Sequence, residues 1–189
     1  GDRVDDAVRA GEAPRPYEIG DRTGPLGVYG RSKLDGELAV HAVLPDAHVV
    51  RTSWVYTGGG GTDFVAVMRR LASTDRVIDV VDDQTGSPTY AKDLVAALLQ
   101  IAGGGVDAPV LHVTNAGSAS RFEQARAVFE EVGADPDRVR PVGTAAVPRP
   151  ARRPVFSALS MADSVRAGLT PLRPWREALA EAVAVPIQQ

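Results

Sequence analysis

A tyrosine and a lysine four residues apart are the side chains in this sequence best suited to acid–base chemistry. Tyr29 and Lys33 lie in the run GVYGRSKL, at the start of a stretch with helical periodicity. Positions i and i+4 of a helix share one face, with Cβ atoms about 5–6 Å apart, so these two side chains can meet. An ammonium group near a phenol favours the ionised phenol. The pair could therefore give a proton to the alkoxide that forms when a carbonyl group is reduced.

The use of lysine elsewhere in the chain supports a special role for this pair. Of the 21 lysines and arginines, only Lys33 and Lys92 are lysines. The compact lysine ammonium and the planar arginine fork are not interchangeable at a binding site. From the residues alone one alternative stays open, namely that the spacing is a coincidence and Lys33 is a solvated side chain on an exposed helix face.

The helix that carries the pair is expected to run from Tyr29 to about Val43 and to end before Pro45. One of its faces should dock on a sheet. That face is made by Leu34, Leu38 and Ala42.

Strand-like and helix-like segments alternate along the rest of the chain. Buried strands are predicted at residues 47–53, 77–81 and 110–113, with helices at 90–101, after Ser120 and at 174–185. Residues 1–27 and 136–154 are rich in proline and charge, which predicts irregular segments. The alternation indicates an α/β fold, the second half of a doubly wound parallel (Rossmann-like) sheet plus a small α/β substrate-binding region.

Candidate binding residues follow the first predicted strand. Ligands of open α/β sheets collect beyond the carboxyl ends of the strands, which is where Trp54 lies, although Trp54 could also be a core residue. The glycines at 58–61 suggest a phosphate loop, but no Lys-Ser/Thr follows them. Thr62-Asp63 instead has the pattern of a helix cap, so we expect a flexible loop there.

Composition argues against several classes of protein. The net charge of −3 predicts no nucleic-acid surface, and the chain has no cysteine. The longest apolar run, residues 94–102, is too short to cross a bilayer. The three histidines lack metal-ligand spacing and are expected at the surface or at strand ends, while Asp82 and Asp83 should point apart on an extended chain. We therefore predict neither a metal site nor a membrane partner.

Four runs, in this order, resemble the dTDP-4-dehydrorhamnose reductases, which are extended short-chain dehydrogenase/reductases. They are GVYGRSKLDGE, VVRTSWVYTGGGGTDFVAVMRRLA, VVDDQTGSPTYAKDL and PARRPVFSAL. The resemblance implies that Tyr29 is the proton donor, and that Tyr29 and Lys33 are both catalytic and both cofactor-binding. It also implies that Trp54 faces the sugar, that Arg153 binds the diphosphate, and that two further side chains, Gln84 and Thr89, lie near the active site.

The function implied by the resemblance is the reduction of a nucleotide-sugar ketone by NADPH or NADH in the cytoplasm. The family starts with a strand and a Gly-x-x-Gly-x-x-Gly turn that holds the cofactor pyrophosphate, and we do not find this unit. We therefore expect the C-terminal portion of such an enzyme, inactive alone. Residues 1–115 would be an incomplete dinucleotide-binding part and residues 116–189 mainly a substrate-binding part.

Removal of half of the sheet would also expose an edge through which two copies of the chain could pair. Two alternatives to a reductase stay open. One is a nucleotide-sugar epimerase or dehydratase of the same superfamily. The other is a regulatory binding subunit without catalysis.

Overall fold

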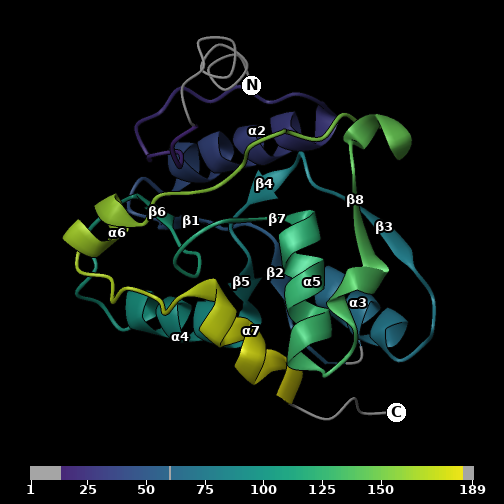
Figure 1. Cartoon of the computed structure of the whole chain (residues 1–189). Coiled ribbons are helices and arrows are strands. Elements are labelled where there is room, and N and C mark those ends of the chain that lie inside the picture. Colours follow the sequence, from purple (N-terminus) through teal and green to yellow (C-terminus); the bar gives the residue numbers. More distant parts are fainter. Residues whose placement is uncertain (1–13, 60, 185–189) are drawn as a thin grey trace.

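The computed structural model describes residues 14–59 and 61–184 of the chain, and it is an α/β structure with parallel strands (Figure 1). Three of its four strand pairs are parallel, and only β4 and β7 run antiparallel. The predicted fold class is therefore confirmed. Figure 1 draws α2 across the top of the molecule, β4 and β7 beneath it, and α4 and α7 at the bottom.

Each strand is short. The pairs are β1 (Val49–Arg51) with β6 (Val110–His112), β2 (Val55–Tyr56) with β5 (Thr89–Tyr90), β3 (Ile78–Val81) with β8 (Val139–Val142), and β4 (Thr85–Gly86) with β7 (Ala119–Ser120).

The helices connect and cover these strands. They are α2 (Val28–Val43), α3 (Phe64–Ala72), α4 (Ala91–Ala102), α5 (Arg121–Glu131), α6 (Ala162–Arg166) and α7 (Trp175–Ala184), with 3₁₀ turns η1 (Pro136–Arg138) and η2 (Thr144–Ala146). The last residue of the C-terminal helix that the sequence predicted, Val185, lies outside the described residues.

Local capping explains where two helices begin. The Asp63 carboxylate accepts a hydrogen bond of 3.0 Å from the backbone N–H of Ala66, so α3 starts at the predicted cap. Ser120 and Glu123 form a reciprocal capping box at α5. Such caps satisfy backbone donors that a helix leaves unpaired at its first turn.

The predicted irregular tail at 136–154 was partly wrong, because it contains β8. This strand pairs in parallel with β3, which is distant in the sequence. Pro141 lies inside β8, opposite Val80. A proline has no N–H to give to a ladder and is tolerated mainly in edge strands. The proline therefore restricts where the strand lies in a sheet without preventing the strand.

The main hydrophobic core lies between α3, α5 and α7. Its fully buried members include Val65, Val128, Phe129 and Leu179. α5 packs against both other helices and against β3. It therefore connects α3, which precedes it in the sequence, to α7 near the C-terminus. A second core joins Ala97 and Ile101 of α4 to the fully buried Leu111 of β6.

The sequence predicted that the apolar face of α2 docks on a sheet, and this was wrong for two of the three residues of that face. α2 has no buried residue; Leu34 is half-buried, Leu38 is 62% exposed and Ala42 is exposed. No residue of α2 belongs to a hydrophobic cluster of the part of the chain that the structure describes. Burial depends on which surface packs against a helix, and helical periodicity alone does not reveal that surface.

The division of the chain at residue 115 stays a prediction. Strand β3 precedes that point and its partner β8 follows it. α3 and α5 likewise contact each other across it. The two proposed parts therefore share a strand pair and a core.

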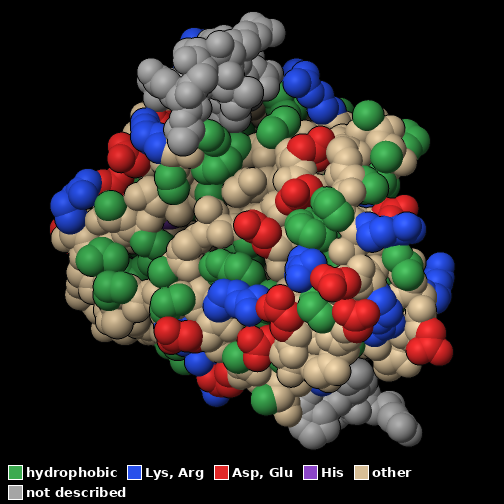
Figure 2. All heavy atoms as spheres, viewed as in Figure 1, with side chains coloured by type: hydrophobic (Ala, Val, Ile, Leu, Met, Phe, Trp, Pro, Cys, Tyr) green, Lys and Arg blue, Asp and Glu red, His purple; other side chains and the backbone are tan. Residues whose placement is uncertain are grey.

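The surface in Figure 2 mixes acidic and basic side chains, with red and blue groups interleaved over its right half. No helix within residues 14–59 and 61–184 is long and apolar enough to cross a membrane.

Candidate functional site

The structure brings Tyr29 and Lys33 together in the first turns of α2. The Lys33 ammonium nitrogen lies 5.8 Å from the centre of the Tyr29 ring. Tyr29 is 75% exposed and Lys33 is also exposed, so both can be reached by a ligand. The roles assigned to this pair stay predictions.

Polar contacts hold α2 against the β1–β6 edge. Arg51, at the end of β1, donates from Nε to both carboxylate oxygens of Glu37, each at 3.0 Å, and from Nη2 to Oε2 at 2.6 Å. The ring of His41 lies 3.2 Å from the carbonyl oxygens of Ala47 and Pro109. Because α2 lacks core contacts, these groups fix the orientation of the helix that carries the Tyr–Lys pair.

Trp54 lies beyond the carboxyl end of β1, as predicted, and its backbone is unusual. Its φ of 47° is the only positive value at a non-glycine residue among the described positions. A Cβ at Gly86 would lie 2.7 Å from Cζ2 of the indole, so the ring packs directly on the glycine backbone. The guanidinium of Arg121 lies over the same ring, 3.6 Å from its centre. The indole is therefore covered on the Arg121 side.

Arg121 was not among the site residues that the sequence predicted. It directly follows the cap of α5, and nothing in the sequence distinguishes it from other residues in the first turn of a helix. Its backbone N–H donates to the carbonyl oxygen of Gln84 at 3.2 Å. The Gln84 amide in turn donates to the hydroxyl of Thr144 at 2.8 Å. Gln84, Arg121 and Trp54 thus meet in one region.

Arg153 is exposed, in the segment that follows η2. Burial, and to a smaller extent the charges of Arg153 and Arg149, lower the pKa of Arg121 to about 10. The guanidinium groups of Arg149 and Arg153 therefore lie close enough to Arg121 for their charges to act on it. Arg153, which the sequence predicted to bind the diphosphate, is thus near Arg121, and Arg121 in turn lies over Trp54.

Thr89 occupies a different environment from the other candidates. It is fully buried, its hydroxyl lies 3.4 Å from the Ser87 carbonyl oxygen, and its N–H donates to the Trp54 carbonyl oxygen at 3.3 Å. These contacts fix the backbone around Trp54, so the structure favours a supporting role for Thr89 over contact with a ligand.

Asp82 and Asp83 point to different partners. Asp82 accepts a hydrogen bond of 2.6 Å from the Ser120 hydroxyl. Asp83 accepts from the hydroxyl and the backbone N–H of Thr144 at 2.6 and 2.8 Å, and these bonds lower the pKa of its carboxyl. Within the described ranges, no group of three or more His, Cys, Asp or Glu side chains is arranged to hold a metal ion.

The glycine loop after β2 is tied to its surroundings, while Gly60 lies outside the described residues. Arg69 donates to the Gly58 carbonyl oxygen and Arg70 to that of Gly61. Gly58, at a φ of 73°, packs so closely on Ala182 of α7 that a Cβ there would lie 2.7 Å from the Ala182 carbonyl carbon. Gly58 thus joins the loop to both α3 and α7, and the flexibility of the loop stays a prediction.

A second glycine pattern escaped the sequence analysis. Gly24, Gly27 and Gly30 have the Gly-x-x-Gly-x-x-Gly spacing. In the described structure no strand precedes them, since only an isolated bridge at Tyr17 lies before α2. The turn of dinucleotide-binding proteins joins a strand to a helix, so this spacing alone does not make a pyrophosphate site.

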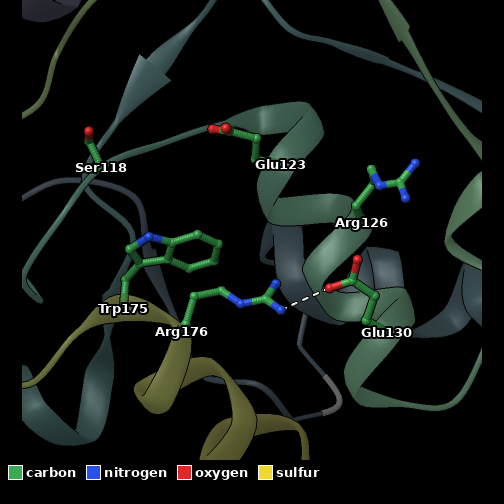
Figure 3. A pocket seen from close by; sticks show the side chains of 6 residues that line it. All are labelled: Ser118, Glu123, Arg126, Glu130, Trp175 and Arg176. Carbon is green, nitrogen blue, oxygen red and sulfur yellow. Dashed lines mark hydrogen bonds and ion pairs between the residues drawn. The ribbon is translucent and has the colours of Figure 1, made fainter.

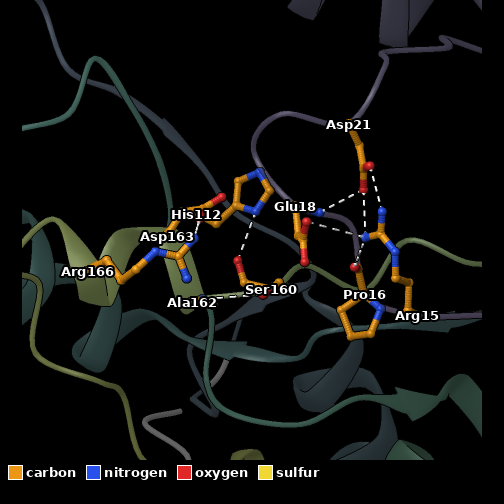
Figure 4. A network of polar contacts seen from close by, with 9 residues as sticks. All are labelled: Arg15, Pro16, Glu18, Asp21, His112, Ser160, Ala162, Asp163 and Arg166. Atoms are coloured by element: carbon orange, nitrogen blue, oxygen red, sulfur yellow. Dashed lines mark hydrogen bonds and ion pairs between the residues drawn. The ribbon is translucent and has the colours of Figure 1, made fainter.

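His112 was expected at the surface or at a strand end, and it lies at the end of β6 but is only 1% exposed. Figure 4 shows its ring against Ser160, with Nδ1 3.1 Å from the Ser160 carbonyl oxygen. Burial lowers the pKa of this imidazole. The same view shows Arg15 of the N-terminal arm held by Asp21, at 2.8 and 3.0 Å.

Two surface hollows contain none of the predicted site residues. One, of about 280 Å³, is drawn in Figure 3, where Arg176 pairs with Glu130 at 2.8 Å beside Trp175. The other, of about 390 Å³, lies beside the end of α3 and is lined by Arg69 and Arg138 among others. In the first hollow Arg126 and Arg176 pair with Asp137 and Glu130, and in the second Arg138 donates to backbone carbonyl oxygens.

Comparisons with known proteins agree with the architecture. The family model described as RmlD substrate binding domain matches residues 4–186. The dTDP-4-dehydrorhamnose reductase of Mycolicibacterium smegmatis is 66% identical over 169 residues, which cover 89% of this chain and 52% of the relative. That of Mycobacterium tuberculosis is 63% identical over 185 residues, covering 98% of this chain and 61% of the relative.

A solved structure is also similar. The dTDP-4-dehydrorhamnose reductase of Bacillus anthracis, in complex with NADP, superposes with a TM-score of 0.84 at 33% identity. The aligned part covers 92% of this chain and 61% of that one. The chain thus spans only between about half and three fifths of the relatives it matches. Since the family model matches nearly every residue, the chain belongs to the RmlD substrate-binding domain family.

Proposed function

We propose that this chain supplies the Tyr–Lys pair and the nucleotide-sugar side of a dTDP-4-dehydrorhamnose reductase. The observation that carries the proposal is the juxtaposition of Tyr29 and Lys33, exposed in the first turns of α2. The names of the two relatives that are 63–66% identical support the substrate class. The NADP bound to the Bacillus anthracis structure supports a nicotinamide cofactor, NADPH or NADH.

The proposed reaction reduces the C4 ketone of dTDP-6-deoxy-L-lyxo-4-hexulose and yields dTDP-L-rhamnose in the cytoplasm. The cofactor supplies a hydride, which forms a new C–H bond at C4 while the carbonyl π-electrons move to oxygen. The Tyr29 hydroxyl gives its proton to that oxygen. Lys33 stabilises the resulting phenolate by its charge and takes a cofactor hydroxyl as its second partner.

The substrate side is proposed at Trp54, Gln84 and Arg153. A flat indole suits the face of a sugar or base, and a guanidinium fork matches the oxygens of a diphosphate. We propose a dTDP-sugar as the small-molecule partner. Pairing of two copies through a sheet edge stays a prediction.

The test uses a complete enzyme, because this chain spans 61% of the Mycobacterium tuberculosis reductase. Residues 4–186 would replace the matching part of that reductase, and the chimera would be assayed for NADPH oxidation and for the sugar product. Tyr29→Phe should lower turnover about 10²–10⁴-fold, because the ring stays but the proton donor is lost. Tyr90→Phe, at a buried ring away from α2, is the control.

Near-normal turnover by the Tyr29→Phe chimera would refute the assignment. A product that is epimerised or dehydrated without net oxidation of NADPH would favour the related epimerase or dehydratase activities. The 189-residue chain alone, assayed in parallel, should show no turnover. Binding of the dTDP-sugar by a chimera that has no activity with any of these substrates would instead favour a regulatory binding subunit.

A further inference from the structure

Arg121 is held between two aromatic rings near the predicted substrate side. Its guanidinium lies 3.6 Å from the centre of the Trp54 ring and 4.7 Å from that of Phe64. Aromatic faces attract cations, and guanidinium groups stack on them well. On another side the indole abuts Gly86, where a Cβ would lie 2.8 Å from the indole nitrogen. The arrangement fixes the plane of the guanidinium.

No carboxylate balances this charge. Within the described chain Arg121 forms no ion pair, and its side chain donates only to the Gln124 amide oxygen, at 3.1 Å. The guanidinium of Arg173, by contrast, is held by two carboxylates, those of Asp93 and Glu181. Arg51 likewise has Glu37. Among the described residues Arg138 is similar, since it lies over Phe129 and donates only to backbone carbonyl oxygens.

Other positive charges approach Arg121 instead. Arg149 and Arg153 are close enough for their charges to lower the pKa of Arg121, although burial lowers this pKa more. Neither of these exposed arginines forms an ion pair within the part of the chain that the structure describes. In the described chain, none of the three guanidinium groups of this arginine cluster (Arg121, Arg149 and Arg153) is thus paired with a carboxylate.

We propose that Arg121 is a ligand for the diphosphate of the nucleotide sugar, binding it together with Arg153 while its guanidinium remains stacked against Trp54. A bound dianion would offset the repulsion within the arginine cluster, and the planar fork can meet two phosphate oxygens at once. The indole then acts as the platform that orients this fork. The covered indole face is accordingly unavailable to the sugar, which leaves the uncovered part of the ring for that contact. This inference rests on the proposed function for the identity of the nucleotide.

This assignment predicts that a ligand must carry a diphosphate in order to bind at the arginine cluster. Thymidine, which has no phosphate, should bind far more weakly than dTDP, whereas inorganic pyrophosphate should bind without any nucleoside. The pyrophosphate of NADPH has similar chemistry, so the cofactor is the competing source of the anion. We assign the cluster to the nucleotide sugar because it adjoins Trp54 and Gln84.

Calorimetric titration of the 189-residue chain with dTDP, pyrophosphate, thymidine and NADPH tests the assignment. Arg121→Gln should weaken binding of dTDP and of pyrophosphate about tenfold to hundredfold, which is the range expected for a lost charge-assisted contact. Arg126→Gln is a matched control on the same helix. It removes the same charge, but Arg126 lies over Phe122 and already pairs with Asp137 at 3.1 Å. Its effect should be less than about threefold.

Fluorescence gives a second readout. The chain has two tryptophans, so Trp175→Phe leaves Trp54 as the only indole. Pyrophosphate should change the emission of Trp54 in this variant, and the change should be lost when Arg121→Gln is added. If Arg121→Gln does not fold, Arg121→Lys is measured instead. It keeps the charge but not the fork and should weaken pyrophosphate binding by about threefold to tenfold.

Equal affinity of the Arg121 variant and the unaltered chain for pyrophosphate would overturn the inference, as would binding of NADPH with the same dependence on Arg121 as dTDP. Absence of pyrophosphate binding by the unaltered chain would overturn it too. These outcomes are independent of turnover. An inactive chimera whose pyrophosphate binding depends on Arg121 would refute the proposed reaction but keep the anion site.

Discussion

Arg51→Ala is expected to release α2 from the rest of the chain. α2 contributes no residue to a hydrophobic cluster of the described structure, and it exposes apolar side chains such as Leu38 and Val43. Its side-chain anchors to the body are the Arg51–Glu37 pair and the hydrogen bonds of His41. Loss of the Arg51 guanidinium removes the stronger of these two anchors.

The expected size of the effect follows from the geometry of the pair. Arg51 and Glu37 are only 24% and 22% exposed at their side chains, with three contacts of 2.6–3.0 Å between them. Exposed ion pairs contribute about 0.2–1 kcal/mol, whereas hydrogen bonds to charged groups contribute about 1.5–3 kcal/mol. Because both side chains remain partly exposed to solvent, we expect Arg51→Ala to lower the free energy of opening α2 by about 2 kcal/mol. This corresponds to an opening equilibrium about 30-fold larger.

Hydrogen exchange of the α2 amides measures that equilibrium directly. Protection in residues 32–43 should fall about 30-fold in Arg51→Ala, while protection in α5 stays unchanged. Arg140→Ala is the control, because the Arg140–Asp79 contact of 3.3 Å joins side chains that are 64% and 54% exposed. The control should change protection by less than about fivefold anywhere. Unchanged α2 protection in Arg51→Ala, or an unaltered chain whose α2 amides already lack protection, would show that the pair does not anchor the helix.

Three further outcomes are expected. Gly86→Ala should destabilise the chain by about 1–3 kcal/mol in urea titrations and shift the emission of Trp54, because a Cβ would overlap the indole; an unshifted spectrum would contradict the contact. His112 has a pKa lowered by burial, so the unfolded chain binds the proton more readily. The urea midpoint should therefore fall as the pH drops below about 6.5, stay flat above it, and lose this dependence in His112→Gln but not in His48→Gln. The chimera with Lys33→Arg should lose most of its turnover, because the planar guanidinium does not fit the position of the lysine ammonium; retained turnover would show that a positive charge alone suffices.

The sequence determined those features that depend on neighbouring residues or on the order of motifs. The end of α2 before Pro45 and the starts of α3 and α5 at Asp63 and Ser120 follow from local backbone chemistry, which a short window of sequence contains. The helical spacing of Tyr29 and Lys33 was sufficient to bring them together. The order of the four runs was sufficient by itself to indicate the family.

Only the tertiary structure decided which surfaces meet. The strand that contains Pro141 exists because β3 lies beside it, and no pattern within residues 136–154 reveals that partner. The helical stripe of α2 has an ordinary apolar period, yet burial requires a second surface, and no residue of α2 joins a hydrophobic cluster of the described chain. The stacking of Arg121 on Trp54 joins residues from different elements. Its charge and burial depend on the distances between these elements in space, which the sequence does not contain.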